Sequence, residues 1–145
     1  MDKEIAHFIK QNYVLSLATY DGKIPYIASL FYLFFNYKIF FLSDIHTKHC
    51  KDILKNSQVA VSIYKKAKNI RKIKGVQLLG NCFLVEPTKK ILQDPSNIFY
   101  KIYKFYIKKF PEAQHLHSYL WTIEPYWIKF TNNEIYFGFK KIWSK

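Results

Sequence analysis

Alternating apolar and polar positions predict β-strands in the first half of the chain. Tyr13–Tyr20 (YVLSLATY) is rich in residues that favour strands, and it runs into Asp21-Gly22, a dipeptide typical of a tight hairpin turn. The apolar segment Ile24–Phe35 predicts a long second strand. Asn36-Tyr37 then predicts a turn, and Lys38–Ser43 predicts the third strand.

The second half of the chain repeats this pattern. Gln58–Tyr64 alternates as a fourth strand, and Gly75–Glu86 predicts a fifth, with Gly80 indicating a bulge or bend. Between them, Lys65–Lys74 reads as a basic loop. Two further strands are expected on either side of a Thr131-Asn132-Asn133 turn: they are Leu120–Phe130 and Ile135–Phe139.

Three segments change to the period of a helix. Asp2 can cap a first helix, in which Ile5, Phe8 and Ile9 share one face. A second helix is expected over Ile45–Asn56, capped by Asp44 or Ser43. Asp94-Pro95 resembles a cap and first helical residue, and it predicts a third helix to Phe110 whose inward residues are Ile98, Phe99, Ile102, Phe105 and Tyr106.

This order of elements predicts a fold in the mainly β class. Strands that follow one another as hairpins, with helices between some of them, are typical of an antiparallel barrel rather than a parallel sheet. No internal repeat or linker divides residues 1–145. We therefore expect one domain, a predominantly antiparallel, Greek-key-like β-barrel with attached helices.

Composition restricts the cellular setting. No apolar run of about 18 residues is present, so no membrane span is expected. The acidic residues in the opening MDKEIAHFIKQN argue against a secretory signal. Cys50 and Cys82 form no CxxC pair, and two free thiols fit a reducing compartment. We expect a cytoplasmic protein.

The net charge of +13 raises the question of nucleic-acid binding. Among the 23 basic residues, however, Arg71 is the only arginine. Reading bases and clamping phosphates with two hydrogen bonds both favour arginine over lysine. Nucleic-acid binding therefore remains only an alternative, which no motif supports.

The segment FFLSDIHTKHC (residues 40–50) contains the residues most suited to binding a ligand. An apolar strand ends here in hydroxyls, imidazoles and a lysine, just where a helix is expected to begin. The start of a helix attracts anions, because its first amide groups are unpaired. Ser43, Thr47, Lys48 and His49 add the donors that a phosphate monoester requires. The alternative is ordinary capping of the helix, with Lys48 and His49 solvated.

From Tyr13 to His49, the order of these segments resembles the opening of the flavin-binding split-barrel proteins, the pyridoxamine 5′-phosphate oxidase-like superfamily. The "LAT-x-DG-x-P" type of first strand is present as LATYDGKIP, and Ser43 ends the third strand. Thr47, Lys48 and His49 occupy the place of the triplet that holds the phosphate of flavin mononucleotide (FMN). The ending TIEPYWIKFTNNEIYFGFKKIW is similar to a little-characterised bacterial branch of the family.

The resemblance implies a split barrel and an FMN site, with NADH or NADPH as the electron donor of an oxidoreductase of unknown substrate. The flavin ring would lie along the second strand, near Ser29–Phe31. Loss of the Lys48 side chain would weaken FMN binding and leave the fold intact. The cofactor-binding residues so implied are Ser29, Leu30, Phe31, Ser43, Thr47, Lys48, His49, Gln77, Trp121 and Lys129.

Some family features are absent from this chain. Ile27 and Tyr32 occupy places where the oxidases carry basic residues for the flavin phosphate. The segment that reads pyridoxal phosphate substrates is not recognisable either, so that oxidase's substrate is not carried over. Two alternatives stay open: a protein that binds flavin or another phosphate ligand without catalysis, and a histidine that ligates a heme iron, as in some distant split-barrel proteins.

The resemblance also implies a homodimer with cofactor sites between subunits. Phe31, Tyr32, Phe34 and Phe35 place apolar side chains on both faces of one expected strand, and each face needs a cover. Trp121, Lys129 and the Lys141–Trp143 tail are the expected partner contributions. The alternative is a monomer whose own helices provide the second cover.

Overall fold

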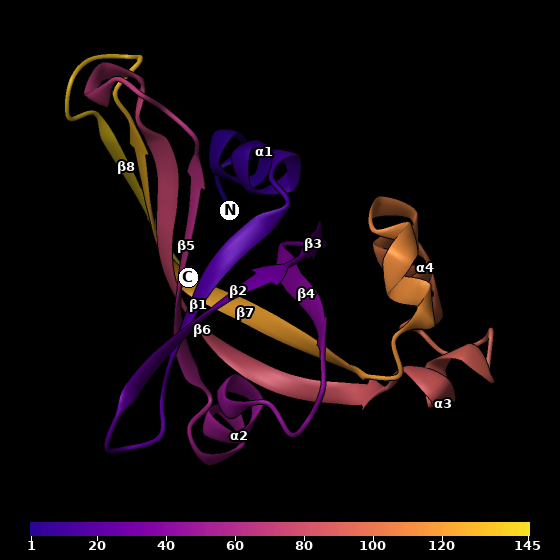
Figure 1. Ribbon diagram of the computed structural model, residues 1–145. Coiled ribbons are helices and arrows are strands. Elements are labelled where there is room, and N and C mark those ends of the chain that lie inside the picture. Colours follow the sequence, from indigo (N-terminus) through magenta and orange to yellow (C-terminus); the bar gives the residue numbers. More distant parts are fainter.

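One antiparallel sheet, curled into a barrel, organises the structure (Figure 1). In this computed structural model, which describes residues 1–145, the strands lie in the order β2-β1-β5-β6-β7-β4-β3, and β8 pairs with β7. The strands are β1 (Val14–Tyr20), β2 (Pro25–Phe31), β3 (Leu33–Phe35), β4 (Lys38–Ser43), β5 (Gln58–Lys65), β6 (Lys74–Pro87), β7 (Tyr119–Asn132) and β8 (Lys140–Ser144). Every strand pair is antiparallel, which confirms the predicted fold class.

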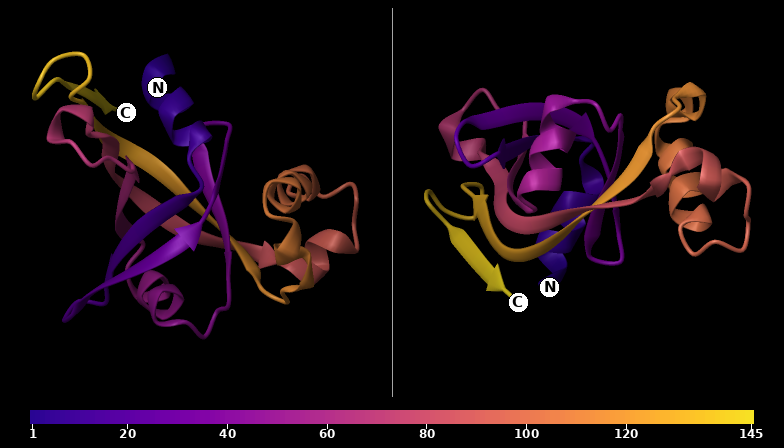
Figure 2. Two further views of the ribbon diagram at one scale, coloured as in Figure 1. Left: turned by 45° about the horizontal axis from the view of Figure 1, so that its top comes forward. Right: turned by 90° about the horizontal axis from the view of Figure 1, so that it is seen from below.

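The helices lie at the ends and on one side of this barrel (Figure 2). They are α1 (Lys3–Gln11), α2 (Lys48–Lys55), α3 (Thr88–Leu92) and α4 (Tyr100–Lys109), with short 3-10 turns η1 (Ile70–Lys72) and η2 (Pro111–His115). The predicted cap of the first helix is confirmed, since the Asp2 carboxylate accepts hydrogen bonds from the amides of Glu4 and Ile5.

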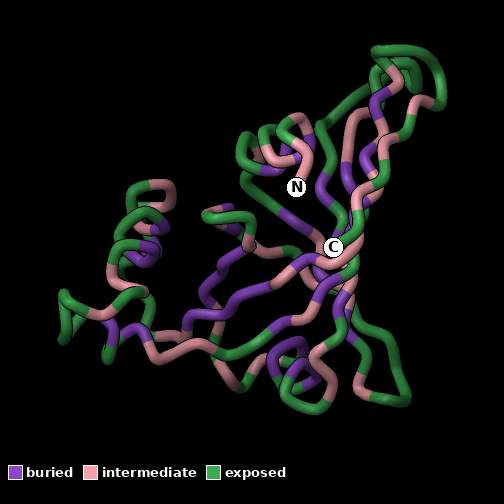
Figure 3. Tube along the Cα trace, turned by 180° about the vertical axis from the view of Figure 1, so that it is seen from behind, coloured by how far each residue is buried: buried purple, intermediate pink, exposed green.

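The barrel interior forms the main hydrophobic core, and the buried stretches of the chain converge there (Figure 3). Strand side chains such as Leu17, Ile63 and Trp121 fill its middle. The predicted inward face of α1, including Phe8, packs against this core, as do Cys50 and Ile53 of α2. The barrel is therefore closed by helices rather than by strands alone.

Helices α3 and α4 form a second layer outside β4. Phe40 and Leu42 point away from the barrel interior and are buried in a cluster with Ile102, Tyr103 and Tyr106. This layer explains why β4 is apolar on both faces. One face lines the barrel, and the other lies under α4.

The predicted long strand over Ile24–Phe35 is interrupted at Tyr32. The Tyr32 amide donates to the carbonyl of Tyr13, and its buried phenol donates to the carbonyl of Ile9. Before this break, β2 pairs with β1. After it, the next strand, β3, pairs with β4. A contact distant in sequence causes this break, and the local pattern did not indicate it.

Two predicted helices begin later than expected. α2 starts at Lys48 with Thr47 as its cap, so Asp44 and Ser43 were the wrong caps. The carbonyl of Asp44 instead accepts a hydrogen bond from the Thr47 amide in a turn. α4 starts only at Tyr100, because Asp94 folds into a turn with Ser96.

The inward face predicted for the third helix needs two corrections. Ile98 lies before α4 and is 79% exposed, and Phe105 is 38% exposed. The short helix α3 is not indicated by the sequence pattern, because its five residues lack a clear apolar period.

The strand predicted over Ile135–Phe139 is wrong. Asn132 and Asn133 accept hydrogen bonds from the amides of Glu134 and Gly138, which hold this segment as a loop. Gly138 adopts φ +86°, a conformation that side chains disfavour. The last strand therefore forms later, as β8. The bulge expected at Gly80 is confirmed by a register shift between Leu79 and Gly80.

No helix of the structure combines the length and the apolar character needed to cross a membrane.

Candidate functional site

Ser43, Thr47 and His49 converge at the junction between β4 and α2. Ser43 ends β4, Thr47 caps α2, and His49 lies in its first turn. The His49 Nε2 atom lies 2.7 Å from the Ser43 hydroxyl and 3.3 Å from the Thr47 hydroxyl. The structure therefore places the His49 ring within hydrogen-bond distance of both predicted hydroxyls.

The first amides of α2 add donors at the same place. The Cys50 amide is capped by the Thr47 hydroxyl, and the Lys51 amide donates to the Thr47 carbonyl. The amides of Lys48 and His49 have no hydrogen-bond acceptor within the chain. Unpaired amides at a helix start carry partial positive charge and bind anions.

His49 is 7% exposed, and burial lowers the pKa of its ring below the usual value for histidine. Its ring is therefore neutral at pH 7, with one nitrogen as donor and the other as acceptor. His49 contributes hydrogen bonding to this site rather than a full positive charge.

The Lys48 side chain is paired with carboxylates. Its Nζ atom lies 2.5 Å from the Asp52 carboxylate and 3.4 Å from the Asp21 carboxylate. Hydrogen bonding to Asp52 raises the pKa of Lys48. Asp52 is 2% exposed and also accepts a hydrogen bond from the Thr19 hydroxyl at 2.8 Å. Lys48 therefore has a structural role, because it neutralises a buried acid.

A cavity of about 700 Å³ lies between β2, the end of β4 and the α4–η2 segment. Its walls include all three residues predicted to lie along the flavin ring, together with Leu42, the neighbour of Ser43. Its lining residues are Ser29, Leu30, Phe31, Leu42, Tyr106, Lys109, Phe110, Pro111, Glu112, Ala113 and Leu116. This volume lies within the range of about 300–1,000 Å³ that is typical of small-molecule sites.

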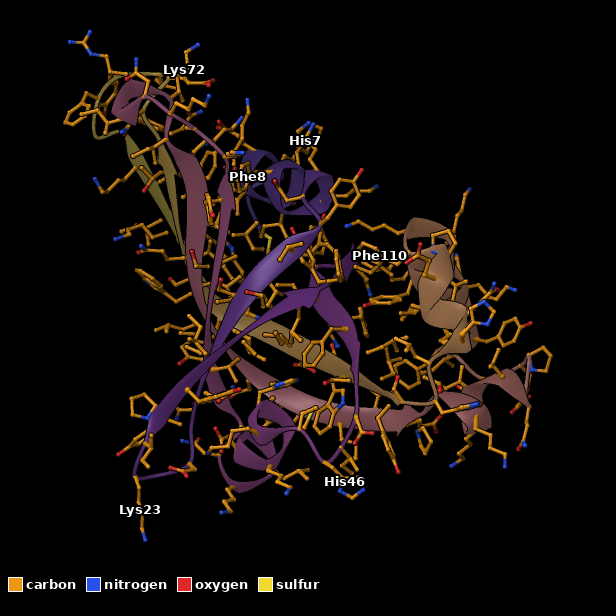
Figure 4. All side chains as sticks on the ribbon, viewed as in Figure 1. His7, Phe8, Lys23, His46, Lys72 and Phe110 are labelled. Atoms are coloured by element: carbon orange, nitrogen blue, oxygen red, sulfur yellow. The ribbon has the colours of Figure 1, made fainter.

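Contacts between α4 and β2 form one wall of this cavity. The rings of Phe31 and Phe110 lie 5.2 Å apart, and the Tyr106 phenol donates to the Phe31 carbonyl at 3.1 Å. Phe110 can be located beside α4 in Figure 4. Helix α4 of the same chain therefore covers part of β2. The sequence pattern led us to expect a partner subunit as that cover.

Gln77 and Lys129 lie away from the cavity, in a row on the outer face of the sheet that also contains Ser29. Strand pairing aligns Ser29, Ser16, Ser62, Gln77 and Lys129 in one row. Adjacent strands are about 4.8 Å apart, so Gln77, three strands from Ser29, is separated from it by roughly 14 Å. Only Ser29 of this row lines the cavity, and a single chain does not bring Gln77 or Lys129 to it.

No family model matches the sequence. A UPF0306 protein of Yersinia pseudotuberculosis is 32% identical over 143 residues, which cover 97% of this chain and 91% of the relative. The chain belongs to the UPF0306 family. A UPF0306 protein of Serratia proteamaculans is 28% identical over 145 residues, covering 99% of this chain and 94% of that protein.

Solved structures establish the fold of this UPF0306 protein. HutZ, the heme storage protein of Vibrio cholerae, superimposes with a TM-score of 0.68 at 20% identity, over 86% of this chain and 89% of HutZ. A FAD-binding protein of Mesorhizobium loti gives a TM-score of 0.65 at 17% identity, over 86% of this chain and 87% of that one. The fold is that of the pyridoxamine 5′-phosphate oxidase-like split barrels.

Trp121 lies in the hydrophobic core of the barrel. It is fully buried, its ring is stacked on Phe41, and its indole N–H donates to the Ser43 carbonyl at 3.0 Å. A side chain enclosed in this way is not available to a ligand of another subunit. Trp121 instead anchors the end of β4, where Ser43 lies.

Residues of the Lys141–Trp143 tail, which we expected to complete a partner's site, also make contacts within their own chain. Lys141 of β8 forms ion pairs with Asp2 and Glu4 of α1, at 3.3 and 3.0 Å. Trp143 packs against the barrel core. Of the Lys141–Trp143 tail, Ile142 remains 62% exposed, and it extends the row of Ser29 and Lys129 on the outer face.

The structure places several residues around the site that the sequence pattern does not indicate as part of it. The four-residue spacing of Lys48 and Asp52 is a signal for a helical ion pair that the sequence contains. Thr19, Tyr106 and Phe110 reach the site from segments distant in the chain, and no local pattern indicates them.

Proposed function

We propose that this UPF0306 protein binds FMN and uses it as an oxidoreductase. The phosphate would lie at the start of α2, against Ser43, Thr47, His49 and the unpaired amides. The flavin ring would lie in the cavity lined by Ser29, Leu30 and Phe31. The observation that carries the proposal is the convergence of Ser43, Thr47 and His49 at the start of α2, where two amides have no acceptor within the chain.

The donor set fits a single phosphate. It offers two unpaired amides, the Ser43 hydroxyl and the His49 imidazole at the junction of β4 and α2, while the Thr47 hydroxyl already donates to the Asp44 carbonyl. These groups are preorganised, since His49 already contacts both hydroxyls. Lys48 adds charge, although Asp52 and Asp21 compensate part of it. One phosphate position favours FMN over a dinucleotide.

Heme is the second candidate, because some proteins of this fold bind it, among them HutZ. The lining of the cavity includes no histidine, cysteine or methionine side chain that could ligate iron. Its tyrosine, Tyr106, donates to a backbone carbonyl, and burial raises its pKa to about 12. The phenolate needed for iron is thus disfavoured, and the residues support flavin.

A bound flavin would supply hydride and electron transfer between a nicotinamide donor and an acceptor. The residues of this chain would bind and orient it. The α4–η2 wall, with Tyr106 and Phe110, would shield one part of the ring from water. No side chain of the site needs to act as a nucleophile.

The first prediction concerns ligand preference. In titrations followed by flavin fluorescence, FMN is expected to bind at one equivalent per chain. Riboflavin, which lacks the phosphate, is expected to bind about ten- to hundredfold more weakly, since one charged hydrogen bond contributes about 1.5–3 kcal/mol. FAD is expected to bind more weakly than FMN.

Equal affinity for riboflavin and FMN would remove the phosphate site from the proposal, and tighter binding of FAD would contradict the choice of FMN. Bleaching of the bound flavin by NADH or NADPH without oxygen would distinguish an enzyme from a carrier. Binding of hemin, but not of flavin, would favour the second candidate.

We also propose a homodimer formed through the outer face of the sheet. This face carries exposed apolar side chains from several strands around the polar row of Ser29 and Gln77: Val14 (46%), Ile27 (65%), Leu79 (39%), Phe83 (44%) and Ile142 (62%). Apolar surface of this extent marks an interaction site. A twofold partner would bring its Gln77 and Lys129 toward the cavity that they do not reach in one chain.

Light scattering at micromolar concentration is expected to give the mass of two chains, and Ile27→Asp/Leu79→Asp is expected to give that of one. Lys23→Asp/Lys55→Asp, at exposed positions outside this face, is the control. A wild-type monomer that binds one FMN per chain would contradict the shared-site arrangement.

A further inference from the structure

A second pocket lies on the other side of α4. It has a volume of about 720 Å³ and is formed by α1, by β3 with its turn to β4, and by α4. Figure 4 labels His7 on α1 and Phe110 at the end of α4, which locates the two helical walls. The residues lining it are Ala6, His7, Lys10, Leu33, Phe34, Phe35, Asn36, Tyr37, Phe105, Lys108 and Lys109.

The floor of this pocket is aromatic. Phe34 and Tyr37 meet edge to face with ring centres 6.4 Å apart, and Phe35 packs on Phe105 at 5.6 Å. Tyr37 lies in the tight turn between β3 and β4, and its side chain is 56% exposed. Aromatic rings left open in a concave surface offer an apolar body a large contact area.

The walls of the pocket are basic. His7 and Lys10 come from α1, and Lys108 and Lys109 from α4, while no acidic side chain lines the pocket. None of these four residues takes part in an ion pair of the structure. The positive charge of the three lysines is therefore not compensated by a carboxylate of the chain, and it remains available to an anion.

Lys109 is the most enclosed of these groups. Its Nζ atom donates to the carbonyls of Asn12 and Tyr32, at 2.7 and 3.0 Å, and lies over the rings of Tyr13 and Tyr32. Burial lowers the pKa of Lys109 to about 8, because no carboxylate stabilises its charged form. Buried charges in proteins are normally paired with a group of opposite charge, and Lys109 forms no ion pair within the chain.

We propose that this pocket binds a small amphipathic anion, with an aromatic or acyl body against Phe34, Phe35 and Tyr37 and one anionic group between Lys10 and Lys108. A carboxylate, sulfonate or phosphate satisfies these lysines equally well. The three aromatic rings and the basic walls together select this class, since a neutral ligand would leave the lysines unused and a small inorganic anion would leave the rings uncovered.

This proposal does not depend on flavin binding. The two cavities share only Lys109 among their lining residues, and they lie against different parts of α4. A bound FMN and a bound anion are therefore expected to be compatible.

The test compares two fluorescent probes with the same hydrocarbon body. 8-Anilinonaphthalene-1-sulfonate carries an anionic group, whereas N-phenyl-1-naphthylamine does not. The sulfonate probe is expected to bind at one equivalent per chain, about tenfold or more tighter than the uncharged probe. Saturation with FMN is expected to leave this binding unchanged.

Two variants separate the roles of the walls and the floor. Lys10→Gln/Lys108→Gln is expected to weaken the sulfonate probe about tenfold and to leave the uncharged probe unchanged. Tyr37→Asn is expected to weaken both probes, and asparagine tolerates the φ of 62° at this position. Lys51→Gln/Lys55→Gln on α2, with the same loss of charge, is the control.

Equal binding of the two probes would overturn the proposal. So would an effect of the α2 control as large as that of Lys10→Gln/Lys108→Gln, or displacement of the sulfonate probe by FMN, which would place the probe in the flavin cavity. Circular dichroism spectra of the variants matching the parent would ensure that lost binding reflects the pocket.

Discussion

Replacing Trp121 by alanine is expected to lower the free energy of unfolding by about 3–5 kcal/mol, the usual range for a buried aromatic side chain. Trp121 is fully buried, and its ring lies parallel to Phe41, with centres 6.3 Å apart and an angle of 6°. The substitution leaves a large cavity in the middle of the barrel. Equilibrium unfolding in urea measures the loss.

A second variant connects this residue to the site. Trp121→Phe keeps an aromatic ring but lacks the indole N–H that donates to the Ser43 carbonyl. It is expected to cost less stability than alanine and to weaken FMN binding, because the end of β4 is then less firmly held. Trp127→Phe, at a half-buried position on the same strand, is the control. A loss of less than about 1 kcal/mol for Trp121→Ala would contradict the assigned packing role.

Lys48→Ala is expected to raise the Kd for FMN about ten- to hundredfold, through loss of a charged hydrogen-bond donor. It is also expected to lower the free energy of unfolding by about 1–2 kcal/mol, since Asp52 then remains buried without its cation. This loss stays small because the Lys48 side chain is 42% exposed. The expectation from the sequence, weaker binding with the fold intact, is revised by the contact with Asp52.

Lys48→Ala/Asp52→Asn distinguishes these two effects. Asparagine retains an oxygen for the Thr19 hydroxyl but carries no charge, so the double variant is expected to regain stability relative to Lys48→Ala. The FMN affinity is expected to stay low if Lys48 contacts the phosphate. Recovery of both quantities would assign Lys48 a structural role alone. Lys51→Ala, on the exposed side of α2, is the matched control.

Much of the fold follows from local signals in the sequence. The pattern predicts Lys38–Ser43 with the bounds that the structure has, because four apolar residues, Ile39–Leu42, form its middle and a turn precedes it. Asp2 was predicted as the cap of α1 for an equally local reason, since its carboxylate reaches amides only two and three residues away. Wherever a competing hydrogen bond came from a distant segment, as at Tyr32, the local pattern gave the wrong boundary.

The residues of the candidate site also form two groups, those that the sequence indicates and those that only the tertiary structure brings together. The sequence by itself determined that hydroxyls and an imidazole gather at one helix start, because Ser43, Thr47 and His49 lie within seven consecutive residues. Only the tertiary structure decided that Lys48 is paired with Asp52 and that Trp121 belongs to the core. It also decided that α4 covers Phe31 and that Gln77 lies across the sheet from the cavity. Contacts between residues distant in the chain depend on how the sheet curls and on where the helices pack, and the period of a single segment carries no information about either.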